Sequence, residues 1–210
     1  MAKERLAHTR IGVLGTGVVG RTLAEGFHGR GHHVVIGSRD PDKPELREWL
    51  DTAGAGIASG TFAQAATHGE LLVLAVLGNA AEEVIAEAGP ANFSGKVVID
   101  AMNPLDFSEG FPPKLSISGD DSLGEHVQRA LPDARVVKAF NTIGNTSFVD
   151  PSFSDGLPTM LIAGNEHRRH PVREARIHEV LVADRVERLD HLGVGKCSLD
   201  ALAERVLAGD

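Results

Sequence analysis

Residues 11–20 read IGVLGTGVVG, and this short stretch decides the fold. A run of apolar or small residues leads into three glycines with the spacing GxGxxG. Val19, Leu23 and Phe27 then fall on one face of a helix. A buried strand, a tight glycine turn and an amphipathic helix are together the context in which this glycine pattern binds a dinucleotide. The stretch therefore predicts a strand, a phosphate-binding turn and a helix that opens a βαβ unit.

Each glycine of the turn has a separate predicted task. Gly15 permits the tight turn, Gly17 lets the backbone approach a pyrophosphate, and Gly20 lets helix and strand pack closely. The start of the helix supplies amide donors to the phosphates, and the Thr16 hydroxyl is a further donor. The alternative is a glycine-rich turn in an ordinary βαβ unit. The predicted phosphate-binding residues are Gly15, Thr16, Gly17, Val18, Val19 and Gly20.

The rest of the chain alternates short apolar runs with segments of helix length. Helical spacing places Leu46 on one face with Trp49, and Leu123 on one face with Val127. Because the apolar runs are nearly continuous, they indicate parallel strands that are buried on both faces. The strand candidates are residues 11–14, 34–36, 71–76, 97–99, 136–137 and 160–163. The alternation predicts an α/β fold of the Rossmann type, with a doubly wound parallel sheet.

The predicted organisation is one dinucleotide-binding domain with a short extension. Residues 1–165 are expected to form the Rossmann domain, and residues 166–210 to form a C-terminal α/β extension of the same domain, which reads as helix, short strand, helix. Residues 103–120 carry three prolines and two glycines and are expected to contain no regular element. Long ordered connections of this kind are often functional.

The end of the second predicted strand decides between NAD and NADP. In NAD-binding proteins a carboxylate at this position holds the ribose 2′-hydroxyl. Here Ser38 and Arg39 follow the strand, and Lys43 lies one turn further on, so the site favours the 2′-phosphate of NADPH. Asp40 offers a displaced carboxylate as the alternative, but Pro41 after it favours a helix cap with a first-turn proline.

Unusual polar residues follow several strands at what is expected to be one edge of the sheet. In open α/β sheets, ligands bind beyond the carboxyl ends of the strands. Asn103 precedes a proline and is therefore extended, so its amide is expected to face either the nicotinamide side or the local backbone. Asn141 and Thr142 are expected either to contact ligand or to start a helix. Leu77 follows the 71–76 strand at the same edge.

Composition excludes several classes of partner. The chain has 210 residues, 42% of them hydrophobic, and a formal net charge of −8. An acidic surface argues against nucleic acid and anionic membranes as partners. Residues 71–77 are too few to span a bilayer, and residues 1–20 read as strand and turn rather than as a secretory signal. A single cysteine, Cys197, excludes a disulfide within the chain and fits a reducing compartment. The expected location is cytoplasmic.

No metal site is expected. The ten histidines include His167, His170 and His178, which would need suitably placed carboxylates to hold a metal ion. Histidines at exposed polar positions are a simpler explanation than a metal site. Cys197 reads as a small buried residue rather than as a reactive thiol.

Residues 11–20, 37–39, 100–105 and above all 136–144 (VVKAFNTIG) resemble the NADP oxidoreductases that depend on coenzyme F420. That family is also similar to the cytosolic domains of membrane ferric reductases. The resemblance implies hydride transfer between the nicotinamide of NADPH and a deazaflavin, and a homodimer. It also implies NADP contacts at Thr16, Ser38, Arg39 and Lys43, with Ala75, Val76 and Leu77 lining the nicotinamide side.

The sequence leaves the hydride acceptor open. Residues 197–202 depart from the family pattern, so the small-molecule acceptor is deazaflavin, another flavin, an iron chelate, or a small carbonyl or imine compound. A second reading is an imine or β-hydroxyacid reductase, although those enzymes usually append a long helical domain. A third is a non-catalytic NADPH-binding redox sensor. No catalytic residue is assigned, because hydride transfer between two cofactors needs mainly proximity and orientation.

Overall fold

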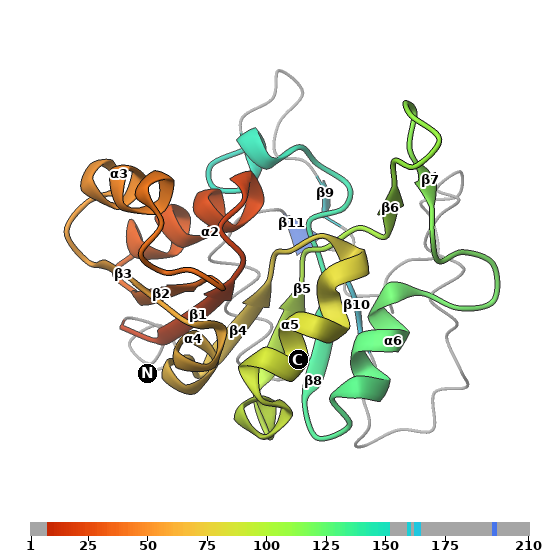
Figure 1. Ribbon diagram of the computed structural model, residues 1–210, viewed down its shortest axis with the longest axis horizontal. Helices are drawn as coiled ribbons and strands as arrows, with labels where there is room; N and C mark the ends of the chain where they lie inside the picture. The colour runs from red at the N-terminus through yellow and green to blue at the C-terminus, as the bar shows by residue number, and fades with distance from the viewer. Residues whose placement is uncertain (1–7, 152–158, 161, 165–194, 197–210) are drawn as a thin grey trace.

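A seven-stranded sheet organises the protein, and its strand order is β10-β8-β5-β4-β1-β2-β3. The computed structural model describes residues 8–151, 159–160, 162–164 and 195–196 (Figure 1). Six of the seven strands run parallel, and β10 pairs with β8 in the antiparallel direction. The parallel strands are β1 (Arg10–Leu14), β2 (His33–Gly37), β3 (Ile57–Gly60), β4 (Leu71–Leu74), β5 (Val97–Asp100) and β8 (Arg135–Lys138). The predicted doubly wound Rossmann sheet is confirmed, and its direction of winding reverses between β1 and β4.

Helices cover both faces of the sheet (Figure 1). Leu23 of α2 and Leu46 of α3 belong to one buried apolar cluster. Phe62 of α4, Val84 of α5 and Val127 of α6 belong to a second cluster. The helices are α2 (Val18–His28), α3 (Pro44–Ala53), α4 (Phe62–His68), α5 (Ala81–Ala88) and α6 (Leu123–Ala130), with 3-10 turns η1 (Gly78–Ala80), η2 (Pro90–Phe93) and η3 (Asn145–Ser147). Because both faces are covered, the four residues of β4 are all buried, which explains its continuous apolar sequence.

The unit of β3 and α4 was not predicted. Ile57 is the one large apolar residue in β3, so the strand carries too weak a hydrophobic pattern to be recognised. The start of α4 is nonetheless encoded locally. Thr61 accepts a hydrogen bond from the Gln64 backbone, and the Gln64 side chain accepts one from the Thr61 backbone, which completes a capping box.

The structure corrects two further expectations about regular elements. Residues 160–163 do not form one strand, because Thr159–Met160 is β9, paired with β11 (Gly195–Lys196), whereas Ala163–Gly164 is β10 in the main sheet. Residues 103–120 do contain a regular element. There β6 (Leu105–Asp106) and β7 (Lys114–Leu115) form a short antiparallel hairpin, which projects from the body of the molecule (Figure 1).

Candidate cofactor-binding site

The carboxyl ends of five parallel strands bring most of the predicted site residues to one edge of the sheet. β1 and β4 are neighbours, and the direction of winding reverses between them. This switch point is where open α/β sheets place their ligands. The segments that follow the five strands are residues 15–17, 38–39, 75–77, 101–103 and 139–141.

The glycine turn after β1 has the geometry that the sequence predicts. Gly15 has a φ of +124°, and a Cβ there would strike the Ala75 carbonyl oxygen. A Cβ on Gly20 would strike the Gly15 carbonyl oxygen. A Cβ on Gly17, in contrast, would meet no heavy atom within 4 Å. The fold itself therefore accounts for Gly15 and Gly20, whereas open space beside Gly17 is what close approach by a ligand requires.

The start of α2 is free to bind an anion. Gly17 is the N-cap residue, and no side chain caps the helix. No acidic residue lies in the first turn, where Val18 and Val19 stand. The first amides of a helix lack partners within the helix and carry a partial positive charge. An uncapped start of this kind is a ready site for phosphate.

Two basic side chains brace the turn. Lys43 Nζ donates to Thr16 Oγ1 at 2.8 Å. Arg21 Nε donates to the Thr16 carbonyl at 2.9 Å, and its Nη2 donates to the Glu45 carbonyl at 3.1 Å. The guanidinium of Arg21 also lies 5.4 Å from the centre of the Trp49 ring, within the range of a cation–π contact. Lys43, which was predicted as a second cation for the 2′-phosphate, thus lies against the glycine turn instead. Arg21 is a nearby cation that sequence analysis did not single out.

Ser38 and Arg39 follow β2, as predicted, but differ in their surroundings. Ser38 is buried, and its hydroxyl oxygen accepts a hydrogen bond from the Asp40 backbone at 3.2 Å. Arg39 is more than half exposed and reaches α5. Its Nη2 lies 2.6 Å from the Glu83 carboxylate, and its Nε lies 3.3 Å from the Glu87 carboxylate. A 2′-phosphate at this position would therefore compete with two carboxylates for Arg39.

Asp40 is not the helix cap that its position before Pro41 suggests. The N-cap of α3 is Lys43, and Pro44 occupies the first turn instead. Asp40 Oδ1 accepts from the Asp42 backbone at 3.1 Å, which is a local turn. The prediction was wrong because two prolines stand close together, and the second one marks the helix start.

The segment after β4 supplies an apolar wall. Ala75 is buried, and its amide donates to the Leu14 carbonyl at 2.8 Å, which fixes the segment beside the glycine turn. Val76 is half-buried. Leu77 is 64% exposed, and Val18 is 65% exposed. Large apolar side chains left open at a ligand edge are typical of a site for an apolar group.

Asn103 and Asn141 meet at the edge beyond β5 and β8. Asn141 Nδ2 donates to the Asn103 side-chain oxygen. Within residues 141–151 a turn leads into the 3-10 turn η3 and no α-helix begins, so the alternative in which Asn141 and Thr142 begin a helix is wrong. Phe140, just before them, has a φ of +69° and packs against the Phe148 ring at 4.7 Å between centroids. A left-handed phenylalanine is uncommon, and tertiary packing holds this turn in place.

A buried ion pair lies directly behind the two asparagines. Asp100 is fully buried, and Lys138 Nζ lies 3.2 Å from its Oδ1. Burial raises the pKa of the Asp100 carboxyl, and burial lowers the pKa of the Lys138 amine. Sequence analysis did not assign either residue to the site. The available signal was a charged residue directly after each of two apolar runs, residues 97–99 and 136–137.

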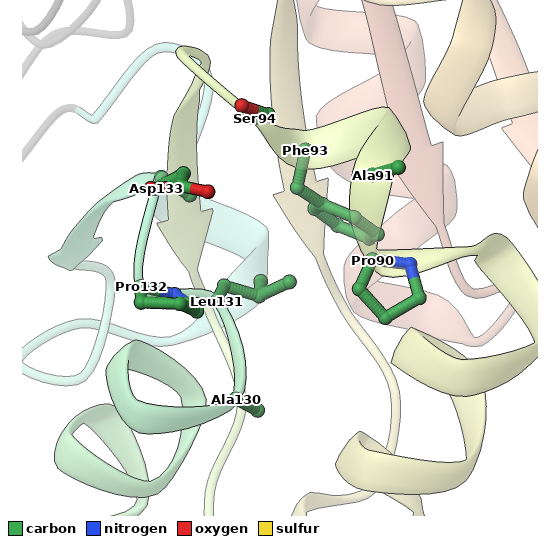
Figure 2. A pocket seen from close by; sticks show the side chains of 9 residues that line it. Pro90, Ala91, Phe93, Ser94, Ala130, Leu131, Pro132 and Asp133 are labelled. Atoms are coloured by element: carbon green, nitrogen blue, oxygen red, sulfur yellow. The ribbon is translucent and has the colours of Figure 1, made fainter.

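A further pocket is lined mostly by apolar side chains (Figure 2). Its walls come from the segments that precede β5 and β8, so it opens at the amino edge of the sheet. Asp133 is its one ionisable side chain. The lining residues are Pro90, Ala91, Phe93, Ser94, Ala130, Leu131, Pro132, Asp133 and Ala134. Without a cation, this pocket does not fit a phosphate-bearing cofactor.

The described residues contain no cluster of three or more His, Cys, Asp or Glu side chains that could hold a metal ion. His167, His170, His178 and Cys197 lie outside the described residues. Among the described helices, none is long and apolar enough to cross a bilayer.

The chain matches a known family over its first half. The model of the NADP oxidoreductases that depend on coenzyme F420 matches residues 10–104. A solved structure from Arthrobacter sp. FB24, classed as an F420-dependent NADP-reductase, is 39% identical. It aligns over 76% of this chain and 74% of its own, with a TM-score of 0.72.

Two curated proteins are also similar in sequence. The F420-dependent NADP reductase of Methanothermobacter marburgensis is 33% identical over 150 residues, which is 67% of this chain and 66% of that protein. The metalloreductase STEAP3 of Rattus norvegicus is 30% identical over 169 residues, which is 79% of this chain and 31% of that protein. The chain thus spans just under two thirds of the first of these relatives and about a third of the second.

Proposed function

The chain belongs to the coenzyme F420-dependent NADP oxidoreductase family, and we propose that it transfers a hydride between NADP(H) and a flavin-like acceptor. Coenzyme F420, a deazaflavin, is the acceptor that we put first. Two relatives carry this coenzyme and NADP in their names, and one of them aligns over three quarters of this chain.

The observation that carries the proposal is the uncapped start of α2 beside the open space at Gly17. A pyrophosphate fits there, held by the amides of residues 17–20 and faced by Thr16 and Lys43. The 2′-phosphate of NADPH would take the Ser38 hydroxyl and the Arg39 guanidinium as partners. These residues together present a polar, cationic surface for three phosphate groups, which is what NADPH requires.

The nicotinamide half would lie further along the same edge. Ala75, Val76 and Leu77 form its apolar wall, and Asn103 with Asn141 offer amide groups. NADPH supplies the hydride from its nicotinamide ring. The residues of this chain bind and orient the two rings and exclude water between them, and no acid or base is needed at the reacting carbon.

The exposed apolar side chains favour a flat ring as the acceptor. Val18 and Leu77 are each nearly two thirds exposed at the ligand edge. Burying such surface against an aromatic ring is favourable at about 25 cal/mol for each Å² removed from water. A charged, hydrated acceptor would gain nothing from these side chains. We therefore rank deazaflavin and flavin above chelated iron.

Calorimetric titration with NADPH and NADH tests the cofactor first. Deazaflavin, riboflavin and chelated ferric iron are then added in turn to protein and NADPH, while the nicotinamide absorbance band is followed. We expect preferential binding of NADPH and oxidation that depends on the deazaflavin. Preferential binding with no oxidation by any acceptor would instead favour a non-catalytic NADPH sensor. We also propose that the protein is a homodimer and is located in the cytoplasm. Light scattering on the purified protein measures its molecular mass and so tests the number of subunits.

A further inference from the structure

Asp100 and Lys138 are placed side by side by the register of the sheet. They are the last residues of β5 and β8, and they are direct partners in the pairing of those two strands. Asp100 is fully buried, and the Lys138 side chain is 21% exposed. The residues next to them in the two strands, Ile99 and Val137, are apolar and buried or half-buried. The pair therefore stands at the edge at which the cofactor is proposed to bind, whereas Arg135, the other charged residue of β8, lies exposed at the opposite end of that strand.

Asp100 and Lys138 form hydrogen bonds to the backbone amide and the backbone carbonyl of Met102. Asp100 Oδ1 accepts from the Met102 amide at 2.9 Å, while Lys138 Nζ donates to the Met102 carbonyl. Asn103 follows at once, and its side-chain oxygen accepts from Asn141 Nδ2. The carbonyl of Asn103 also accepts from the Gly78 amide at 3.2 Å, which joins this segment to the apolar wall after β4.

The arrangement costs more than an apolar core would. Burying two charges carries a desolvation penalty that mutual attraction seldom repays in full. Among the described residues, Asp100 Oδ2 is also buried without a hydrogen-bond partner. Apolar residues of similar size at these two positions would avoid this desolvation penalty. The pair is better explained by what it fixes than by the stability it provides.

We propose that Lys138 and Asp100 are positioning residues, which set the Asn103–Asn141 amide pair to receive the nicotinamide carboxamide of NADP(H). Within the described part of the chain, Asn103 Nδ2 and Asn141 Oδ1 have no hydrogen-bond partner. They offer a donor and an acceptor, and a carboxamide presents the complementary groups. This inference rests on the proposed function and names the residues that serve its nicotinamide half.

Binding of the whole cofactor is compared with binding of its adenosine end. Calorimetry measures the affinity of Lys138→Met for NADP⁺ and for adenosine 2′,5′-bisphosphate, which lacks the nicotinamide. We expect roughly tenfold weaker NADP⁺ binding, the equivalent of one hydrogen-bonded contact, and unchanged binding of the bisphosphate. Lys138→Arg keeps the charge and a donor, and we expect it to recover most of the loss.

Lys96→Met is the matched control. Lys96 Nζ donates to the Ala66 carbonyl at 2.7 Å, and burial lowers the pKa of its amine as it does for Lys138. It lies just before β5, at the opposite edge of the sheet. Replacing it removes a comparable bond far from the proposed site, so both affinities are expected to stay at the wild-type values.

A second variant keeps the test valid if Lys138→Met does not fold, because that change leaves Asp100 as an unpaired buried charge. The double variant Asp100→Asn/Lys138→Met removes both charges and is measured in the same way. Wild-type affinity for NADP⁺ in a folded variant, or an equal loss for both ligands, overturns the positioning role. Wild-type protein that binds neither ligand refutes the proposed cofactor, which is a separate outcome.

Discussion

Arg39 Nη2 lies 2.6 Å from the Glu83 carboxylate, so the arginine proposed to read the 2′-phosphate is held by an acidic group of another element. Arg39 follows β2, whereas Glu83 belongs to α5, which follows β4. Because β1 lies between β2 and β4, this contact spans the phosphate-binding turn after β1. A 2′-phosphate bound here would compete with this carboxylate for the arginine.

Replacing Arg39 by Ala tests which cofactor the site selects. A hydrogen bond to a charged group contributes about 1.5–3 kcal/mol, so NADPH affinity is expected to fall by roughly 10- to 150-fold. NADH affinity should hardly change, because NADH lacks the phosphate. Arg47→Ala is the control, since Arg47 is similarly exposed and pairs with Asp42 at 2.7 Å. Calorimetry that finds equal losses for both cofactors would show the phosphate assignment to be wrong.

Replacing Glu83 by Gln should have the opposite effect. The variant removes the competing charge from Arg39 and keeps the size of the side chain. Exposed ion pairs contribute about 0.2–1 kcal/mol, so NADPH should bind tighter by about 1.5- to 5-fold and NADH should not.

Glu82→Gln is the matched control for that gain. Glu82 is its neighbour in α5, but its carboxylate faces His126 at 3.8 Å instead of Arg39. Tighter binding in both variants would mean that the overall charge of α5 is responsible, not the contact with Arg39.

Local sequence patterns predicted the parts of the fold that are encoded locally. The GxGxxG turn and continuous apolar strands such as β4 have signatures that tertiary context does not alter. β3 was missed because its stability comes from pairing with β2, through which Val34 meets Ile57, rather than from its own apolar content. Asp40 was misassigned because a nearby second proline, Pro44, sets the helix start.

Sequence patterns could point to candidate site residues that directly follow one strand, but not to contacts between residues of different elements. Ser38, Arg39 and Lys43 could be predicted as site residues because each follows the second strand within six residues. The partners of Arg39 on α5 and the pairing of Asp100 with Lys138 depend on contacts 44 and 38 residues apart in sequence. Only the register between strands and the packing of helices bring such residues together.

Asp121 links the stability of the protein to pH. Arg129 donates to its carboxylate at 2.7 Å and holds the pKa of Asp121 down at about 2, with help from the Ser122 amide and His126. Because the pKa is lower in the folded state, the stabilisation is fully present above the usual aspartate value of about 3.9. It is lost as the pH falls through about 2.

The Asp121→Asn variant makes this contribution measurable. Thermal unfolding of both proteins is followed between neutral pH and pH 2. We expect the wild type to be the more stable near neutrality, and the difference to shrink once the pH drops below about 4. A difference that stays constant down to pH 2 would contradict the assigned cause.

Gly17 and Gly20 lie in the same turn but differ in the space available for a Cβ atom. A Cβ on Gly17 meets open space, so Gly17→Ala should change the free energy of unfolding by no more than about 1 kcal/mol, the usual scale of a helix cap. NADPH affinity should nevertheless fall, because the methyl group occupies the space proposed for the pyrophosphate. Gly20→Ala is instead expected to lower the free energy of unfolding itself, since its Cβ would strike the Gly15 carbonyl and force β1 and α2 apart. Denaturant unfolding and NADPH titration of both variants check this division. If Gly17→Ala binds NADPH as the wild type does, the pyrophosphate lies elsewhere, and the glycine serves the turn alone.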